Sequence, residues 1–289
     1  MELGRAGKKC SKRLDLTGCK LYISGMTESE QRALSNEQIS EFRLNGFIKV
    51  EDVLTPEEVT KIGEHCDFVS TGGAENIPAD SLQIEPALRD TAKETENRVM
   101  ATRKLFNMAV HDDLLWKHAT NPKIVDIAAD LLGTDDIKMY GDQYFMKSPR
   151  TGSAQPWHQD SASWRDIFPV DLVTAWTAID DSTLENGCLH FVPGTHRWGM
   201  MSKERLDNFI EDLDTAAWPS IPVPLRSGSI SFHHSLTLHT SSANKSDKRR
   251  RGYAIHFMRA NSWQDQTVTD APKMPAFKQV RGQTFPGRV

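Results

Sequence analysis

The stretch that decides the interpretation of this chain is Pro156-Trp157-His158-Gln159-Asp160-Ser161. Alternate residues of an extended segment share a face, so His158 and Asp160 are expected to point the same way while Gln159 points away. An imidazole and a carboxylate on one face can bind the same metal ion. A later histidine, His239, would complete a set of two histidines and one carboxylate, the arrangement associated with non-haem Fe(II) oxygenases.

Motifs on both sides of this stretch follow one another in a recognisable order. They are Leu34–Phe42, Asn45-Gly46-Phe47, Tyr144–Pro149, Trp164, Trp176–Leu189, Val192–His196 and His239–Phe257. Together they resemble the phytanoyl-CoA dioxygenase family of 2-oxoglutarate-dependent oxygenases, over most of residues 34–260. The last motif carries a histidine, a serine, an asparagine and an arginine at the family's offsets, here His239, Ser241, Asn244 and Arg250.

The resemblance implies a role for each matching position. His158, Asp160 and His239 would bind Fe(2+), and Arg250 would bind the distal carboxylate of 2-oxoglutarate, because its planar fork accepts both oxygens and stays charged. The other candidates are Trp176, Lys147 and Lys104 for the co-substrate, and Trp164 and Gln143 for the substrate.

The chain has ten histidines, and the serious rivals of His239 for the third ligand position are His233 and His234. The offsets to Asn244 and Arg250 favour His239, and we expect one of the two rivals to face the interior of the barrel. We further expect Gln159 and Ser241 to orient the ligands. This interpretation places Arg250 inward, with Arg249 and Arg251 on the opposite face of the strand. Without the family, residues 248–251 would be a solvated basic cluster or a phosphate-binding patch.

Asp160 also bears on the reaction. Related iron enzymes that install a halogen have alanine or glycine at this position, and this chain keeps the carboxylate. The resemblance therefore implies hydroxylation of an unactivated C–H bond, with O2 consumed and succinate and CO2 released. The substrate would be a small molecule, either an acyl-CoA, an amino-acid-like compound or a specialised metabolite. Two alternatives stay open: a zinc-dependent hydrolase on the same ligands, and a jelly-roll binding module without catalysis.

Helix signals come first along the chain, and strand signals follow. Thr55-Pro56-Glu57-Glu58 predicts a helix start with a capping box, and a second helix is predicted from Asn121-Pro122 to a stop at Gly133. Short runs rich in β-formers then occupy residues 137–147, 172–179, 188–192, 229–233 and 253–258. This order predicts a mainly β protein with flanking helices around a double-stranded β-helix, the cupin-like jelly roll, with the metal at one open end.

The length of 289 residues and 38% hydrophobic content suit one core. We expect a polar, disordered leader over residues 1–30 and a single oxygenase domain over residues 31–289. Two polar insertions, residues 70–100 and 200–226, are expected to be lids or substrate walls, with a short helix over residues 203–213.

Composition narrows the partners and the compartment. A net charge of −4 and a pI near 6.2 argue against general nucleic-acid binding, and no apolar window is long enough to span a membrane. The four cysteines form no dense framework, and the basic start lacks the apolar region of a secretory signal. We expect a cytoplasmic protein with a small-molecule substrate. A peroxisomal or mitochondrial location and the oligomeric state stay open.

Overall fold

Eight antiparallel strands form the larger sheet of the computed structural model, which describes residues 32–89, 95–211, 219–268 and 277–289. In order across the sheet they are β1 (Phe47–Val50), β10 (Ile230–His234), β7 (Val173–Ala178), β12 (Arg250–Arg259), β4 (Ile137–Lys147), β3 (Thr102–Phe106) and β2 (Leu82–Ile84). The eighth strand, β14 (Gln279–Arg281), pairs with β4. All five predicted β runs are strands, and the run predicted over residues 137–147 has the expected bounds.

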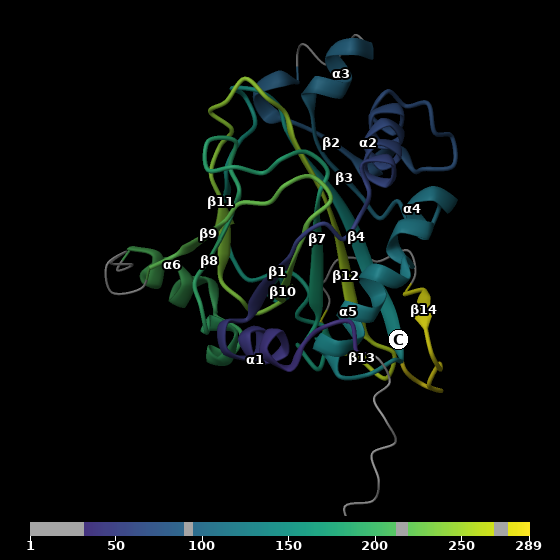
Figure 1. Ribbon diagram of the computed structural model, residues 1–289, viewed down its shortest axis with the longest axis vertical. Helices are drawn as coiled ribbons and strands as arrows, with labels where there is room; N and C mark the ends of the chain where they lie inside the picture. Colours follow the sequence, from purple (N-terminus) through teal and green to yellow (C-terminus); the bar gives the residue numbers. More distant parts are fainter. Residues whose placement is uncertain (1–31, 90–94, 212–218, 269–276) are drawn as a thin grey trace, which may run out of the picture. The chain divides into compact units, whose positions relative to one another are not determined.

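A smaller sheet faces the larger one (Figure 1). Its four strands are, in order, β5 (Gln155–His158), β11 (His239–Ser241), β8 (Leu189–Phe191) and β9 (Ile221–Val223). A separate pair joins β6 (Ile167–Phe168) to β13 (Trp263–Gln264). The two facing antiparallel sheets form the predicted double-stranded β-helix, and the fold class is confirmed.

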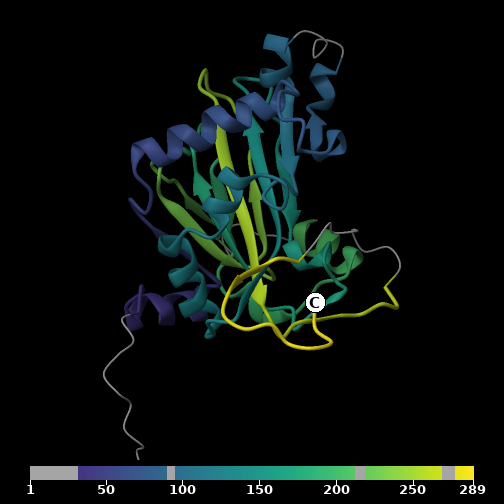
Figure 2. The ribbon, with the colours of Figure 1, turned by 90° about the vertical axis from the view of Figure 1, so that its right-hand side faces the viewer.

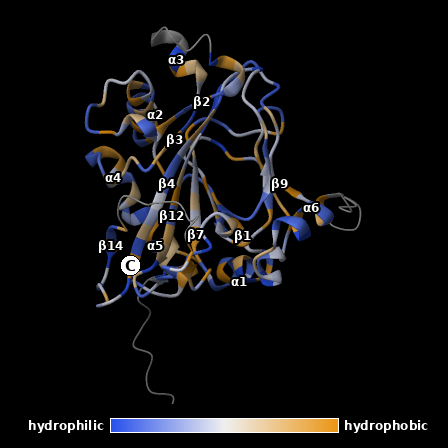
Figure 3. Ribbon diagram, turned by 180° about the vertical axis from the view of Figure 1, so that it is seen from behind, coloured by the Kyte–Doolittle hydropathy of each residue, from blue (hydrophilic) through white to orange (hydrophobic). Residues whose placement is uncertain are grey.

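Most of the helices pack on the outer face of the larger sheet, whereas the helix Lys203–Glu211 lies beside the smaller sheet (Figure 1). The described α-helices are α1 (Asn36–Asn45), α2 (Pro56–Ser70), α3 (Thr95–Ala101), α4 (Asp113–Ala119), α5 (Pro122–Leu132) and α6 (Lys203–Glu211). Figure 2 shows α2 lying across the sheet, and Figure 3 shows hydrophobic colouring on α5 and on β7. Both predicted helix starts are confirmed: Thr55 and Glu58 form the capping box of α2, and α5 ends at Gly133, whose φ is 69°.

The two faces of the larger sheet have different neighbours because side chains alternate along each strand. On β12, Tyr253, Ile255 and Phe257 join the core beneath the helices. Ala254, from the opposite face, packs with Trp176 and with residues of the smaller sheet. Side chains on this inner face therefore meet the space between the sheets, where the candidate site lies.

Residues 32–289 form one compact unit. The predicted leader lies outside the described residues. The first predicted insertion contains short elements, namely two 3-10 turns, η1 (Ala79–Ser81) and η2 (Pro86–Leu88), together with β2 and α3. The second contains α6 and β9, and α6 begins at Lys203 as predicted. Among the helices of the described residues, none is long and apolar enough to cross a membrane.

Candidate metal centre

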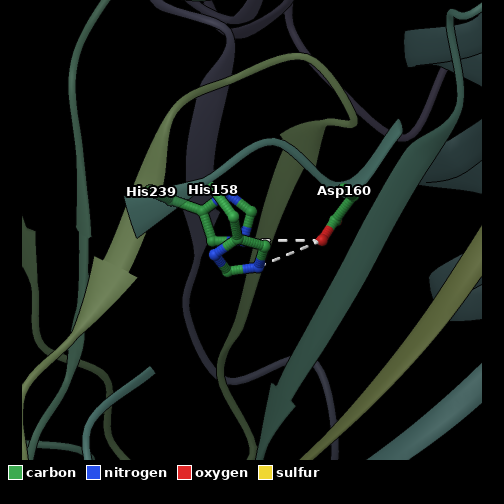
Figure 4. Close-up of side chains that lie close together, drawn as sticks. All are labelled: His158, Asp160 and His239. Atoms are coloured by element: carbon green, nitrogen blue, oxygen red, sulfur yellow. Dashed lines mark ion pairs between the residues drawn. The ribbon is translucent and has the colours of Figure 1, made fainter. Parts of the chain in front are cut away.

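The three predicted ligands meet between the sheets. His158 ends β5 and pairs directly with His239, the first residue of β11, while Asp160 begins a 3-10 turn, η3 (Asp160–Ala162). Gln159 between them is still extended, with φ −110° and ψ 132°, so the alternation of faces holds although the strand has ended. The side chains point toward one another (Figure 4): Asp160 Oδ1 lies 3.5 Å from His158 Nε2 and 3.6 Å from His239 Nε2.

Backbone carbonyls fix which nitrogen of each histidine faces the carboxylate. His158 Nδ1 lies 2.8 Å from the carbonyl oxygen of Pro156, and His239 Nδ1 lies 2.8 Å from that of Thr237. A carbonyl only accepts, so each Nδ1 donates, and in the neutral form of each imidazole the lone pair is on Nε2. Burial, followed by the nearby His158, lowers the pKa of His239 well below its usual value, which favours the neutral form that binds metal.

Asp160 uses its two oxygens differently. Oδ1 faces the two imidazoles, whereas Oδ2 accepts hydrogen bonds from Thr174 Oγ1 at 2.9 Å and from His233 Nε2 at 3.3 Å. Burial opposes ionisation of this carboxyl, but the neighbouring histidines outweigh it and hold its pKa well below the usual range. Two imidazoles and one carboxylate, with their ligand atoms all within 4.8 Å of one another, fit Fe(II) in the arrangement expected from the sequence.

The residues expected to orient the ligands do something else. The Gln159 side chain points away from the cavity and bonds to the carbonyl oxygens of Gly199 (3.0 Å) and Leu236 (2.8 Å). Ser241 Oγ accepts a hydrogen bond from Lys147 Nζ at 2.8 Å. The expectation that Gln159 and Ser241 orient the ligands was therefore wrong. Two backbone carbonyls orient the histidines, and Thr174 with His233 holds the carboxylate.

One cavity is lined by all the residues that the sequence predicted to contact the metal, the co-substrate or the substrate. Besides the three ligands, its lining includes Arg250, Trp176, Lys147, Lys104, Trp164 and Gln143. Within the described parts of the two insertions, no residue lines this cavity, so they do not supply the substrate wall we expected. The walls come instead from β3, β4, β7, β10 and β12 of the larger sheet, from β5, β8 and β11 of the smaller sheet, and from the segment around Trp164.

Arg250 is a buried cation that has no anionic partner among the described residues. Its side chain is only 2% exposed, and its guanidinium carbon lies 5.2 Å from the centre of the Trp176 ring. Nη2 donates to the carbonyl oxygen of Gly187 at 2.9 Å, while Nε has no partner among the described residues. Burial lowers the pKa of Arg250 to about 10. A carboxylate entering this end of the cavity would satisfy both the charge and the free donor.

The two predicted lysines also line the cavity. Lys147 Nζ donates to the carbonyl oxygens of Ser241, at 3.1 Å, and Ser242, so it ties β4 to the segment that follows His239. Burial, and then the neighbouring Arg250, lowers the pKa of Lys147 to about 6. Lys104 Nζ lies 4.9 Å from the centre of the Phe145 ring, and burial lowers its pKa.

Three residues of the site were missed or left undecided by the sequence. His233, a rival for the third ligand, does line the cavity, whereas His234 does not. Thr174 and His256 lie side by side, with 2.9 Å between Thr174 Oγ1 and His256 Nδ1. The period of two along β12 carried a signal for His256, because Arg250 and His256 are an even number of residues apart and share a face.

The arginines on either side of Arg250 face outward, as expected. Arg249 makes two hydrogen bonds to the carboxylate of Asp67, at 2.7 and 2.9 Å. Arg251 bonds to Asp180, at 2.8 and 2.9 Å, and also to Asp67. Because both guanidinium groups already have carboxylate partners, a phosphate-binding patch at this position is not favoured.

Comparisons with known proteins agree with this geometry. The family model described as Phytanoyl-CoA dioxygenase (PhyH) matches residues 42–252. A Caenorhabditis briggsae protein, "Phytanoyl-CoA dioxygenase domain-containing protein 1 homolog", is 29% identical over 75% of this chain and 88% of its own length. A Stutzerimonas stutzeri protein, "Probable alpha-ketoglutarate-dependent hypophosphite dioxygenase", is 27% identical over 78% of this chain and 79% of its own length.

Solved structures show the same fold. The non-heme alpha ketoglutarate dependent carbocyclase SnoK from nogalamycin biosynthesis has a TM-score of 0.66 and 25% identity, over 83% of this chain and 91% of that one. EctD from S. alaskensis has a TM-score of 0.71 and 18% identity, over 89% of this chain and 90% of that one.

Proposed function

The chain belongs to the phytanoyl-CoA dioxygenase family, and from that premise we propose that it is an Fe(II)- and 2-oxoglutarate-dependent dioxygenase that hydroxylates a small molecule. The observation that carries the proposal is Arg250, which is buried with no anion beside it in the described part of the chain, at one end of the cavity that holds the three candidate ligands. The ligands alone could equally hold zinc for hydrolysis. A hydrolase would have no need of a buried cation with a free donor.

Each residue has a defined task in this proposal. His158, Asp160 and His239 would hold the iron through Nε2 and Oδ1 atoms that other contacts already orient. When bound, iron and 2-oxoglutarate supply the oxidising chemistry, in which O2 and 2-oxoglutarate give succinate and CO2 as a C–H bond is hydroxylated. Arg250 would bind the distal carboxylate, and the Trp176 ring would cover its guanidinium and keep water out.

Relatives support the cofactors of this proposal. The S. stutzeri relative and the SnoK structure are both described as alpha-ketoglutarate dependent, one as a dioxygenase and the other as a carbocyclase. Because these two relatives are described by different reactions, the reaction that this chain catalyses on its substrate has to be inferred from its own residues. Retention of Asp160 supports hydroxylation, because the carboxylate occupies the position that a halide would need.

Substrate and compartment belong to the same proposal. The buried, partly aromatic walls around Trp164 and Trp176 suit a small molecule better than a nucleic acid or a membrane surface. We place the protein in the cytoplasm. The two described cysteines, Cys66 and Cys188, are buried and free, as expected of a reducing compartment.

The test needs no substrate. Metal-free protein receives Fe(II) and then 2-oxoglutarate without oxygen, while the visible charge-transfer band of their complex is followed. We expect the band in wild-type protein and its loss in His158→Ala and His239→Ala. His190→Ala is a matched control, because His190 lies on β8 but outside the cavity lining, and it should keep the band. Tight zinc binding with no band in wild-type protein would favour the hydrolase instead.

A further inference from the structure

The end of the cavity remote from Arg250 carries a second buried group without a partner. His256 lies on the inner face of β12, six residues beyond Arg250, which places the two about 20 Å apart along the strand. It lines the cavity, is 3% exposed, and its Nε2 has no hydrogen-bond partner among the described residues. Under the proposed function, on which this inference rests, Arg250 marks the co-substrate end and His256 the substrate end.

The neighbouring hydrogen bonds determine whether His256 Nε2 is a donor or an acceptor. Asp160 is an ionised carboxylate and can only accept, so the single hydroxyl proton of Thr174 goes to its Oδ2, 2.9 Å away. Thr174 Oγ1 must therefore accept the hydrogen bond that joins it to His256 Nδ1, also at 2.9 Å. The proton of a neutral His256 is consequently on Nδ1, and its Nε2 is a bare acceptor.

The surroundings keep His256 neutral. Burial lowers its pKa to about 4, which outweighs the opposing effect of Asp160, so a second proton on Nε2 is absent near pH 7. Trp164 lies beside it, with 4.3 Å between the ring centres, and Trp164 also lines the cavity. The result is a fixed acceptor next to an apolar aromatic wall. A buried acceptor that stays unpaired destabilises its surroundings, so this position calls for a donor.

We propose that His256 Nε2 accepts a hydrogen bond from the substrate, which therefore carries an O–H or N–H group next to an apolar surface. A hydroxyl, an amine or an amide N–H would satisfy this acceptor, whereas a plain hydrocarbon chain or an ether would not. The bond would also position the substrate near Asp160, because Thr174 links the two side chains. His256 thus selects among the substrate classes that the family allows.

The state of His256 can be measured directly by NMR. Protein with ¹⁵N-labelled histidine is loaded with 2-oxoglutarate and with zinc, a diamagnetic replacement for Fe(II), and His256→Gln identifies the His256 signals by their absence. We expect a protonated Nδ1 and a bare Nε2. A proton found on Nε2 would overturn the proposal, because that atom would then be a donor.

Two probes test whether the acceptor is used. We would add 2,2,2-trifluoroethanol, a strong donor, and 2,2,2-trifluoroethyl methyl ether, which has no O–H. The alcohol should shift the Nε2 resonance of His256 and the ether should not, while His118, equally buried but outside the cavity, stays unchanged as an internal control. By ¹⁹F titration, His256→Leu should weaken binding of the alcohol about two- to tenfold, and His256→Gln, which keeps an acceptor, should weaken it less.

The outcomes separate this inference from the proposed function. Equal responses to the alcohol and the ether, or no Nε2 response to either, would mean that only water or packing satisfies the site, and the inference would be wrong. The charge-transfer band of the wild-type protein with Fe(II) and 2-oxoglutarate is measured beside it. A band without an Nε2 response rejects only the role of His256, whereas a missing band rejects the proposed function itself.

Discussion

Replacing Arg250 with methionine should separate binding from stability. The guanidinium is buried, and within the described residues it has no carboxylate partner. Lowering the pKa of an arginine from its ordinary value to about 10 corresponds to about 3 kcal/mol of free energy that opposes folding. Methionine fills similar space without the charge. We therefore expect Arg250→Met to leave the free energy of unfolding of ligand-free protein unchanged, or to raise it by up to about 3 kcal/mol.

The same change should abolish tight binding of 2-oxoglutarate. Two hydrogen bonds to a carboxylate contribute about 1.5–3 kcal/mol each, so their loss should weaken binding at least ~100-fold. Urea unfolding measures the stability, and anaerobic titration of the charge-transfer band measures the affinity. Arg249→Met is the matched control, because it removes an arginine that pairs with Asp67 outside the cavity, and it should keep the affinity. Unchanged affinity in Arg250→Met would place the carboxylate clamp elsewhere, and a large loss of stability would refute the argument about the buried charge.

Three further substitutions test the hydrogen bond from Thr174 to Asp160, the packing of the Trp176 ring against Gly252, and the effect of pH through His118. Thr174→Val removes the hydroxyl donor to Asp160 Oδ2 and should weaken metal binding about 10–100-fold in a chelator competition; unchanged affinity would contradict this role. In Gly252→Ala, the new Cβ would lie 1.9 Å from a Trp176 ring atom, so unfolding measurements should show a loss of about 1–3 kcal/mol, and no loss would mean that the ring moves freely. Burial lowers the pKa of His118 to about 4 in the folded protein, against about 6.5 in the unfolded chain. As the pH is lowered, the unfolded chain is therefore protonated first, and the free energy of unfolding decreases. Between pH 7.5 and pH 5 this should cost wild-type protein about 2 kcal/mol in urea unfolding that His118→Phe does not lose, and equal losses would contradict it.

Local chemistry made the elements of this fold predictable. The start of α2 follows from Thr55, Pro56 and Glu58 alone, because each satisfies or removes a backbone donor of the first turn. The end of α5 follows from Gly133, which adopts the left-handed conformation there. These signals depend on neighbours a few residues away, so the sequence contains them fully. The candidate ligand His239 was favoured for another reason: its spacing to Asn244 and Arg250 matches that of a family.

Contacts between distant segments were not predictable in the same way. The Gln159 amide faces away from the cavity, as alternation predicts, but its partners Gly199 and Leu236 come from loops whose paths no local pattern gives. The insertions were recognisable as irregular, yet composition carries no information about which surface they cover. His256 shows the limit most clearly. Period two places it on the inner face, but Ala254 has the same property and has no polar group to offer a ligand.

The partnerless atoms at the two ends of the cavity are best understood together. Within the residues that the structure describes, the Nε of Arg250 is a donor without an acceptor, and the Nε2 of His256 is an acceptor without a donor. Both are buried on one strand, where each lowers the stability of the ligand-free protein, and packing alone would have favoured apolar residues. Because the two residues lie about 20 Å apart along the strand, no single group of a ligand can satisfy both atoms. An anion at Arg250 and a donor at His256 would satisfy them, so under the proposed function we expect the same strand both to bind the co-substrate and to select the substrate.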